Sequence, residues 1–198
     1  MTFEQALLQL QAADPLRVTV SGDIGSGKST FAKHLAEALE IPRISVGQLM
    51  REEAARRNMT LDDFGALLET DEEVDKAMDT MQTAKSKEIT RGVFEGRMAW
   101  HFVESPKVRV FLSCDPDEAA QRIWNDHNGM RDTYASIEEL RAANETRKAS
   151  EETRYQTYYS LSAYDLNNFD VVVNTTNLSK DEVFEETVIK IAQIRANS

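Results

Sequence analysis

The sequence has little cysteine and contains no long hydrophobic run. Its one cysteine, Cys114, cannot form an internal disulfide, and because it lies in an apolar run we interpret it as a buried thiol in a reducing compartment. No signal peptide is recognisable, and no apolar stretch reaches the length of about 18 residues that a membrane span needs. We therefore expect a soluble, cytoplasmic protein with no membrane partner.

Basic residues are also scarce relative to acidic ones. The 198-residue chain carries 23 Lys and Arg against 34 Asp and Glu, a net charge of −11, and has no run of lysines and arginines. Nucleic acid is therefore not expected as a partner, whereas a small phosphorylated ligand held locally by arginines is compatible with this charge. The histidines, His34, His101 and His127, lack ligand-like spacing, so no structural metal is expected.

The most informative segment is a glycine-rich motif between a strand and a helix. A β-branched run at 18–20 breaks into GDIGSGKS at 22–29 and resumes with helical spacing through Phe31, Leu35 and Leu39. Glycines let backbone N–H groups surround a phosphate chain, and the helix that follows directs its positive end at the same anion. The motif predicts a P-loop; the alternative is a turn that only joins a strand to a helix.

The residue types of the P-loop suit a nucleotide. Lys28 can reach the terminal phosphates, the Ser29 hydroxyl can ligate Mg²⁺, and Thr30 adds a hydroxyl near the α-phosphate. The predicted nucleotide-binding residues are Gly22, Asp23, Ile24, Gly25, Ser26, Gly27, Lys28, Ser29 and Thr30.

The rest of the chain alternates short apolar strands with helices. This pattern predicts an α/β fold with a five-stranded parallel sheet covered by helices on both faces. The expected strands lie near 18–20, 43–46, 92–95, 107–114 and 170–174. The expected helices lie near 2–13, 28–39, 47–57, 61–69, 72–90, 117–125, 136–158 and 179–195. Ligands of such a sheet bind at the carboxyl ends of the strands, where the P-loop is.

Polar residues follow the second strand at this edge. Ser45 and Gly47 offer an accessible backbone at a helix start, and Arg51 lies one helical turn inside that helix. The arrangement suits a second phosphate that faces the P-loop. The alternative, a helix N-cap beside a solvated arginine, stays open at this point.

The third strand ends in Glu95, Gly96 and Arg97. A carboxylate beside the P-loop can hold a water of the Mg²⁺ shell, so Glu95 is the candidate for that role. Gly96 permits a close turn that directs Arg97 toward the cleft, and an arginine in an apolar junction needs an anionic partner. The alternative is a Glu95–Arg97 salt bridge that only fixes the loop.

Arginines also lie on the long helix expected at 136–158. Arg147 and Arg154 are seven residues apart, so they share one helix face, and Arg131 lies in the loop that leads into this helix. The alternative for these charges is a solvated face.

Taken together, these motifs resemble the nucleoside monophosphate kinases, and more narrowly the short archaeal-type cytidylate kinases. The matching segments run from Val18 to Thr176: the P-loop, SVGQLMRE, MTLDDF with DEEVDKAMD, FEGRMAW, TRKASEETRY and YDLNNFDVVVNT. The resemblance implies one P-loop kinase domain over 1–198, with a monophosphate-binding insertion at 47–91 and a lid at 126–150. The N-terminal helix, within 1–15, lies outside the resemblance.

The family pattern also implies roles for individual residues. Arg51 and Arg97 would hold the monophosphate together with Ser45, Gly47 and Gly96. Arg147 and Arg154 would reach the transferring phosphoryl group, so Lys28, Arg97, Arg147 and Arg154 are the expected catalytic residues. ATP would be the phosphoryl donor, with Mg²⁺ as cofactor, and related small kinases suggest a monomer.

The expected reaction is phosphoryl transfer from MgATP to a pyrimidine monophosphate, CMP or dCMP. A GTPase would carry an Asn-Lys-x-Asp motif and a transporter ATPase a Leu-Ser-Gly-Gly signature, and the sequence has neither. A kinase for AMP or UMP, or a non-catalytic P-loop regulatory module, remains an alternative.

Recognition of the base is expected from the inserted helices. Cytosine presents an N4 amino donor beside an N3 acceptor, so its reader should be a carboxylate or an amide. Asp75 and Asp79 are four residues apart on one helix face, and Gln82 lies three residues beyond. The alternative is that these are solvated helix residues.

Overall fold

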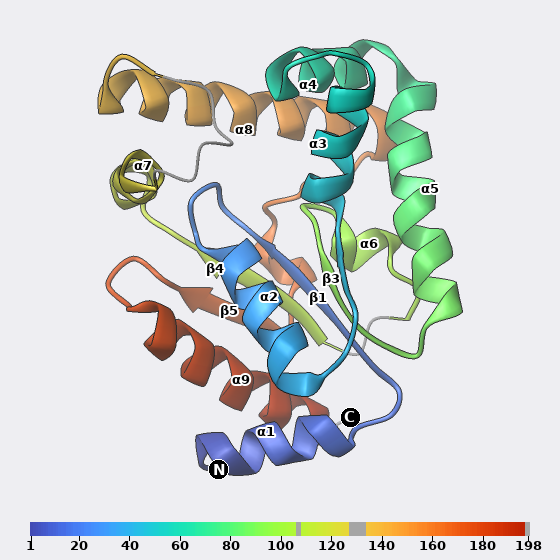
Figure 1. Ribbon diagram of the computed structural model, residues 1–198, viewed down its shortest axis with the longest axis vertical. Helices are drawn as coiled ribbons and strands as arrows, with labels where there is room; N and C mark the ends of the chain where they lie inside the picture. The colour runs from blue at the N-terminus through green and yellow to red at the C-terminus, as the bar shows by residue number, and fades with distance from the viewer. Residues whose placement is uncertain (106–107, 127–133, 197–198) are drawn as a thin grey trace.

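A computed structural model describes residues 1–105, 108–126 and 134–196 of the chain. Its centre is a five-stranded parallel sheet with the strand order β2-β3-β1-β4-β5, as Figure 1 shows. In chain order the strands are β1 (Leu16–Gly22), β2 (Arg43–Ser45), β3 (Arg91–Glu95), β4 (Val108–Ser113) and β5 (Val171–Asn174). The predicted α/β architecture is therefore confirmed.

Helices cover both faces of this sheet. They are α1 (Phe3–Ala12), α2 (Lys28–Leu39), α3 (Val46–Arg56), α4 (Leu61–Thr70), α5 (Glu72–Glu88), α6 (Ala99–Phe102), α7 (Pro116–Asn125), α8 (Ile137–Tyr159), the 3₁₀ helix η1 (Leu166–Asn168) and α9 (Lys180–Ala196). Two of them, α6 and η1, were not predicted as separate elements. They contain four and three residues, too few to show a helical period in the sequence.

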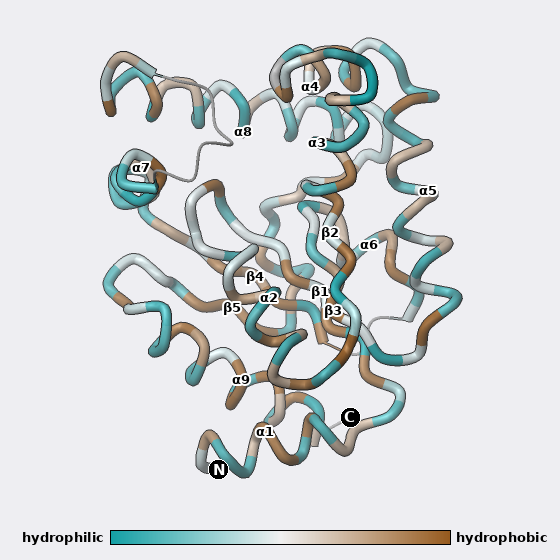
Figure 2. Tube along the Cα trace, in the orientation of Figure 1, coloured by the Kyte–Doolittle hydropathy of each residue, from teal (hydrophilic) through white to brown (hydrophobic). Residues whose placement is uncertain are grey.

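The main core lies between the sheet and α1, α2 and α9. Val18 and Val20 of β1 are fully buried against apolar residues of these helices, whereas Thr19 and Ser21 point to the other face. That second face is covered by α6 and the end of α8, where Phe111 of β4 packs on aromatic rings. Apolar residues accordingly colour the central strands in Figure 2, and the helices alternate apolar and polar residues.

Side-chain caps fix where several helices begin. Thr2 and Gln5 form a capping box at α1, and Ser136 caps α8 by accepting a hydrogen bond from the Glu139 N–H at 3.2 Å. Asp115 caps α7 by accepting from the backbone N–H groups of the first turn. The helix starts expected from the sequence agree with these starts to within a residue or two.

The helices α3, α4, α5 and α8 stand above the carboxyl ends of the strands in Figure 1. Of these, α4 and α5 fall within the predicted insertion at 47–91, and α3 begins one residue before it. In the predicted lid at 126–150, residues 127–133, which include Gly129 and Arg131, lie outside the described residues. The rest of this range includes the first turns of α8. None of the described helices combines the length and the apolar character of a transmembrane span.

Candidate active site

The P-loop connects the end of β1 to the start of α2. Gly25 and Gly27 both adopt positive φ angles, +76° and +83°, a backbone conformation that other residues rarely take. A Cβ atom at Gly25 would lie only 2.8 Å from the Ala119 Cβ of α7. The loop is therefore packed so closely against α7 that only glycine fits, and its backbone surrounds the N-terminus of α2.

Neighbouring strands and helices hold this loop in place. The Asp23 N–H donates to the Leu112 carbonyl at 2.9 Å, and the Thr175 hydroxyl donates to the Ser26 carbonyl at 3.2 Å. The Asp23 carboxylate accepts a hydrogen bond from Lys148 of α8 at 2.9 Å. The P-loop is thus anchored from β4, from the segment after β5 and from α8.

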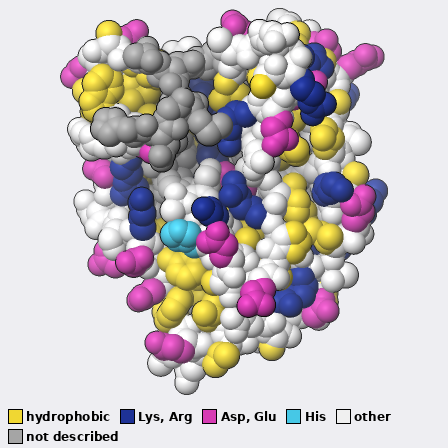
Figure 3. Space-filling model, in the orientation of Figure 1, with side chains coloured by type: hydrophobic (Ala, Val, Ile, Leu, Met, Phe, Trp, Pro, Cys, Tyr) yellow, Lys and Arg dark blue, Asp and Glu magenta, His cyan; other side chains and the backbone are white. Residues whose placement is uncertain are grey.

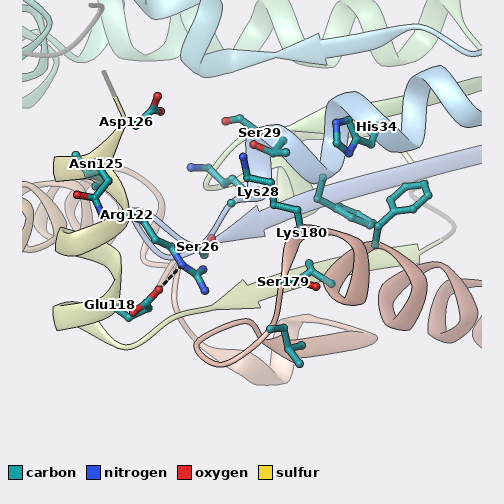
Figure 4. A pocket seen from close by; sticks show the side chains of 18 residues that line it. Ser26, Lys28, Ser29, His34, Glu118, Arg122, Asn125, Asp126, Ser179 and Lys180 are labelled. Atoms are coloured by element: carbon teal, nitrogen blue, oxygen red, sulfur yellow. Dashed lines mark hydrogen bonds and ion pairs between the residues drawn. The ribbon is translucent and has the colours of Figure 1, made fainter. Parts of the chain in front are cut away.

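A cavity of about 620 Å³ opens beside the P-loop, a size that suits a nucleotide. Residues 25–30 of the predicted nucleotide-binding set line it, whereas Gly22, Asp23 and Ile24 do not. The other walls come from α2, α7 and the start of α9. Figure 4 shows Lys28 and Arg122 on opposite sides of this space.

Arg122 of α7 is held rigidly at the cavity wall. Its Nε donates to Glu118 at 2.9 Å, and its Nη2 donates to the Thr175 carbonyl at 2.6 Å. Its Nη1 also donates to the Thr175 hydroxyl at 3.1 Å, so all three nitrogens are held, and the side chain can present the flat face of a fixed cation to a ligand in the cavity.

The carboxyl end of the sheet brings together Lys28, Ser29 and Glu95. Glu95 is only 3% exposed; its carboxylate accepts hydrogen bonds from the Ser29 hydroxyl and from the Arg43 Nε, the latter at 3.2 Å. Burial alone would raise the pKa of Glu95, but Lys28 and Ser29 hold it below its usual value. A hydroxyl and an ionised carboxylate side by side are the oxygen donors that Mg²⁺ accepts, directly or through water.

The Ser29 and Glu95 side chains could not hold a metal ion by themselves. Among the described residues, no group of three or more His, Cys, Asp or Glu side chains is arranged around a common point. The site therefore fits an ion such as Mg²⁺, which keeps several waters and takes further oxygens from substrate phosphates.

Burial and the nearby Arg97 guanidinium lower the pKa of Lys28 to about 7. The lysine of the free protein is therefore mostly neutral at about pH 8, whereas the phosphates of bound ATP favour its ammonium form. Binding of ATP at that pH should take up about one proton, and ATP affinity should fall as the pH rises above about 7. Calorimetric titration in buffers of different ionisation enthalpy measures this uptake.

Lys33, which lies on the exposed side of α2, supplies the matched control for this proton uptake. The uptake should persist in the Lys33→Ala variant and vanish in Lys28→Ala. Equal uptake in both variants would mean that another group titrates.

Arg97 lies beneath the P-loop and is nearly buried, with 9% of its side chain exposed. Its Nε donates to the Glu151 carboxylate at 2.6 Å, and its Nη1 donates to the Gly22 carbonyl at the start of the P-loop. The carboxylate partner of Arg97 among the described residues is therefore Glu151 of α8, not Glu95 as in the alternative considered from the sequence. The turn at Gly96 packs against Val46, where a Cβ would approach to 3.1 Å.

The two predicted arginines of α8 differ in their surroundings. Arg147 is 43% exposed and donates from its Nε to Glu151 at 3.1 Å, so it shares this carboxylate with Arg97. Arg154 is 4% exposed and pairs with Asp75 of α5 at 3.1 Å. Both lie on the helix face predicted from their spacing, but only Arg147 joins the cluster beside the P-loop.

The predicted base-reading carboxylates contact α8. Asp75 is engaged by Arg154, and Asp79 accepts a hydrogen bond from the Tyr159 hydroxyl at 2.6 Å. Burial, together with the neighbouring Asp75, raises the pKa of Asp79 to about 7 in spite of this hydrogen bond. Gln82 is 1% exposed, and its Nε2 has no hydrogen-bond partner among the described residues. The prediction that these residues read a base stays a prediction, and Asp75 also links two helices.

The segment after β2 has features of both interpretations considered from the sequence, a helix N-cap and an anion site. Ser45 caps α3 by accepting from the Gln48 N–H at 3.3 Å. The Arg51 Nη1 nevertheless lies near the same helix start, 3.6 Å from where a Cβ on Gly47 would be. A cationic side chain and a helix N-terminus thus lie together here, as an anion site requires.

Basic side chains therefore gather at the carboxyl edge of the sheet, although the protein as a whole is acidic. Figure 3 shows Lys and Arg side chains across the middle of the drawn face, beside a histidine. The chain carries 34 acidic and 23 basic residues overall, so this concentration is local and suits a small, highly charged anion.

The comparisons with known proteins agree with this geometry. A model of the cytidylate kinase-like family matches residues 17–177. The chain belongs to this family. The membership confirms the resemblance stated from the motifs, and it confirms the expected enzyme class, a nucleoside monophosphate kinase. The helix α1 lies outside the matched region of this cytidylate kinase-like protein, as expected.

Individual relatives cover most of the cytidylate kinase-like chain. A cytidylate kinase of Methanocella arvoryzae is 37% identical over 161 residues, which are 80% of this chain and 87% of the relative. One of Methanosphaerula palustris is 32% identical over 180 residues, 91% of this chain and 99% of the relative. A solved shikimate kinase from Bacteroides thetaiotaomicron matches with a TM-score of 0.61 and 17% identity over 92% of this chain and 99% of its own, a likeness in fold.

Three residues of the cytidylate kinase-like site were missed from the sequence. Arg43 is two residues before Ser45 in β2, so the two side chains lie on the same face of the sheet. That spacing could have identified Arg43 from the sequence. Glu151 is four residues after Arg147 on the same helix face, which is also a visible signal. Arg122 has no such signal, because only the tertiary fold brings α7 against the P-loop.

Proposed function

We propose that this protein transfers the γ-phosphoryl group of MgATP to CMP or dCMP. The observation that carries the proposal is the cluster beside the P-loop, in which Lys28, Arg97 and Arg147 surround one carboxylate at the carboxyl edge of the sheet. Three cations from three separate segments suit the charge of a transferring phosphoryl group. The family and its cytidylate kinase relatives support the choice of substrate.

In this proposal the cavity beside the P-loop takes ATP, with its base between Arg122 and the start of α9. The P-loop backbone and Lys28 hold the phosphates, and Ser29 and Glu95 would hold Mg²⁺, Glu95 through a water. The ion, when bound, neutralises charge on the phosphates and orients them.

The monophosphate binds on the opposite side of the P-loop, in the insertion at 47–91. Arg51, with Ser45 and Gly47, holds its phosphate from the start of α3, and Arg97, with Gly96, holds it from the end of β3. Arg147, within the lid at 126–150, and Arg154, four residues beyond it, approach from α8. No general base is required, because the acceptor oxygen belongs to an ionised phosphate, so positioning and charge neutralisation carry the catalysis.

Base selection in this proposal comes from α5. Asp79 accepts from the N4 amino group of cytosine, and Gln82 supplies an amide that can both donate and accept. A carboxylate acceptor at Asp79 favours cytosine over uracil, since uracil presents a carbonyl where cytosine presents the amino group.

The test is a coupled assay with ATP and a panel of CMP, dCMP, UMP, AMP, GMP and dTMP. We expect the highest kcat/KM for CMP or dCMP. The Lys28→Ala variant, purified in the same way, measures contaminating kinase activity. A tenfold preference for AMP or UMP would contradict the substrate while preserving the enzyme class; turnover of none of the six would favour a nucleotide-binding regulatory module.

A further inference from the structure

We propose that Glu151 is a positioning residue of this kinase: its buried carboxylate fixes Arg97, Arg147 and Tyr164 as one cluster beside the P-loop. The proposal rests on the proposed function, because it assigns the cluster to phosphoryl transfer. It adds a residue that acts on the phosphates only through the arginines it holds.

The two oxygens of Glu151 divide its partners between them. Oε2 accepts from the Arg97 Nε at 2.6 Å and from the Tyr164 hydroxyl at 3.0 Å, while Oε1 accepts from the Arg147 Nε at 3.1 Å. The partners come from the end of β3, from α8 and from the segment between α8 and η1. A single carboxylate therefore fixes the relative positions of three separate parts of the chain.

These contacts leave part of each guanidinium for a phosphate. Glu151 takes the Nε of both arginines and the Gly22 carbonyl takes the Arg97 Nη1, so these contacts do not use the Arg97 Nη2 or the Nη groups of Arg147. The Tyr164 ring lies under Arg97, with the guanidinium carbon 6.0 Å from the ring centre, and so restrains a second side of that group. Orientation fixed before substrate binds is the property that makes charged groups effective in catalysis.

Charge explains why a carboxylate is needed at this point. Glu151 is 7% exposed and lies close to Arg97 and Arg147, two cations that would repel one another without it, and to Lys28. Although burial alone would raise it, Arg97 and Arg147 hold the pKa of Glu151 at about 2, so the carboxylate is ionised throughout the working range of pH. The cluster keeps a net positive charge, as a phosphate site requires.

The test compares Glu151→Gln with Glu145→Gln. Both variants remove one negative charge from α8, but Glu145 is on the exposed side, with 61% of its side chain accessible. We expect Glu151→Gln to lower kcat by about 10- to 100-fold, with the ATP dissociation constant changed less than about threefold, because the arginines lose their orientation. Glu145→Gln should match the wild type.

A double-mutant cycle separates positioning from general damage. If Glu151 acts through Arg147, adding Glu151→Gln to Arg147→Ala should lower kcat by a smaller factor than it does in the wild type. Equal factors in both backgrounds would overturn this part of the proposal.

A second measurement does not depend on turnover. In NMR spectra of the free protein, the Nε–Hε signals of Arg97 and Arg147, assigned from their alanine variants, should shift in Glu151→Gln and not in Glu145→Gln. Unshifted signals would overturn the proposal, and so would shifted signals with kcat within twofold of the wild type. If the wild type phosphorylates no monophosphate, the proposed function fails, and these signals still decide whether Glu151 fixes the arginines.

Tyr164→Phe provides another variant should the glutamine substitution prevent folding. It removes one hydrogen bond to Glu151 and leaves the charge and the ring. We expect a smaller loss of kcat in the same direction, about fivefold, the size expected for one hydrogen bond. A kcat equal to that of the wild type would contradict the role of the cluster.

Discussion

Replacement of Lys28 by alanine should lower kcat by on the order of 10²-fold or more, the largest loss that we expect from a single substitution. Lys28 follows the P-loop glycines at the first position of α2, where its ammonium can reach phosphates that lie on the loop. In the free protein, burial and Arg97 destabilise its charged form. The interaction is therefore gained only when phosphate is present, and its loss affects the reaction rather than the fold.

Steady-state kinetics and thermal unfolding together check this result. Lys33→Ala is the matched control, since Lys33 lies on the same helix and forms only an exposed contact with Glu37 at 3.8 Å. The control should retain wild-type turnover, and both variants should unfold near the wild-type temperature. A Lys28→Ala enzyme within a few-fold of the wild type would remove the P-loop lysine from the mechanism.

Replacement of Arg97 by alanine should affect the monophosphate rather than ATP. We expect kcat to fall on the order of 10²- to 10³-fold and the KM for the monophosphate to rise, while the ATP dissociation constant stays within a few-fold. The physical reason is the position of Arg97, which lies after β3 and across the P-loop from the cavity that we assign to ATP.

The same substitution should destabilise the protein by about 3 kcal/mol, because it leaves the buried Glu151 carboxylate without its shortest ion pair. Urea unfolding measures this change in the free energy of unfolding. It also shows whether the variant is folded in the absence of urea, where the kinetic comparison is made. Arg109→Ala is the control, as Arg109 pairs with Asp170 at 2.7 Å in a more exposed position. Loss of ATP affinity alone in Arg97→Ala would contradict the assigned role.

Much of the site could be predicted because its elements are local. The P-loop is a contiguous motif whose glycines, lysine and serine each have a chemical reason at that spacing. The residues after β2 and β3 could be placed near it, because parallel strands present their carboxyl ends at one edge of the sheet. The direct contact between Ser29 and Glu95 agrees with that expectation.

The partners of the arginines could not be predicted in the same way. Arg97 and Glu151 are 54 residues apart, and Arg154 and Asp75 are 79 residues apart. Several carboxylates near Arg97 in sequence or on neighbouring strands would have satisfied its charge equally well. Local spacing contains no information on which of them the packing of α8 brings within reach.

The sequence by itself determined the succession of the main strands and helices along the chain, and the P-loop, since each depends on residues close together in the chain. Only the tertiary structure decided that Glu151 joins Arg97 to Arg147, that Asp75 is engaged by Arg154, and that Arg122 lines the cavity beside the P-loop. Charged side chains pair through space, and a buried charge takes whichever partner the packing of distant segments brings to it.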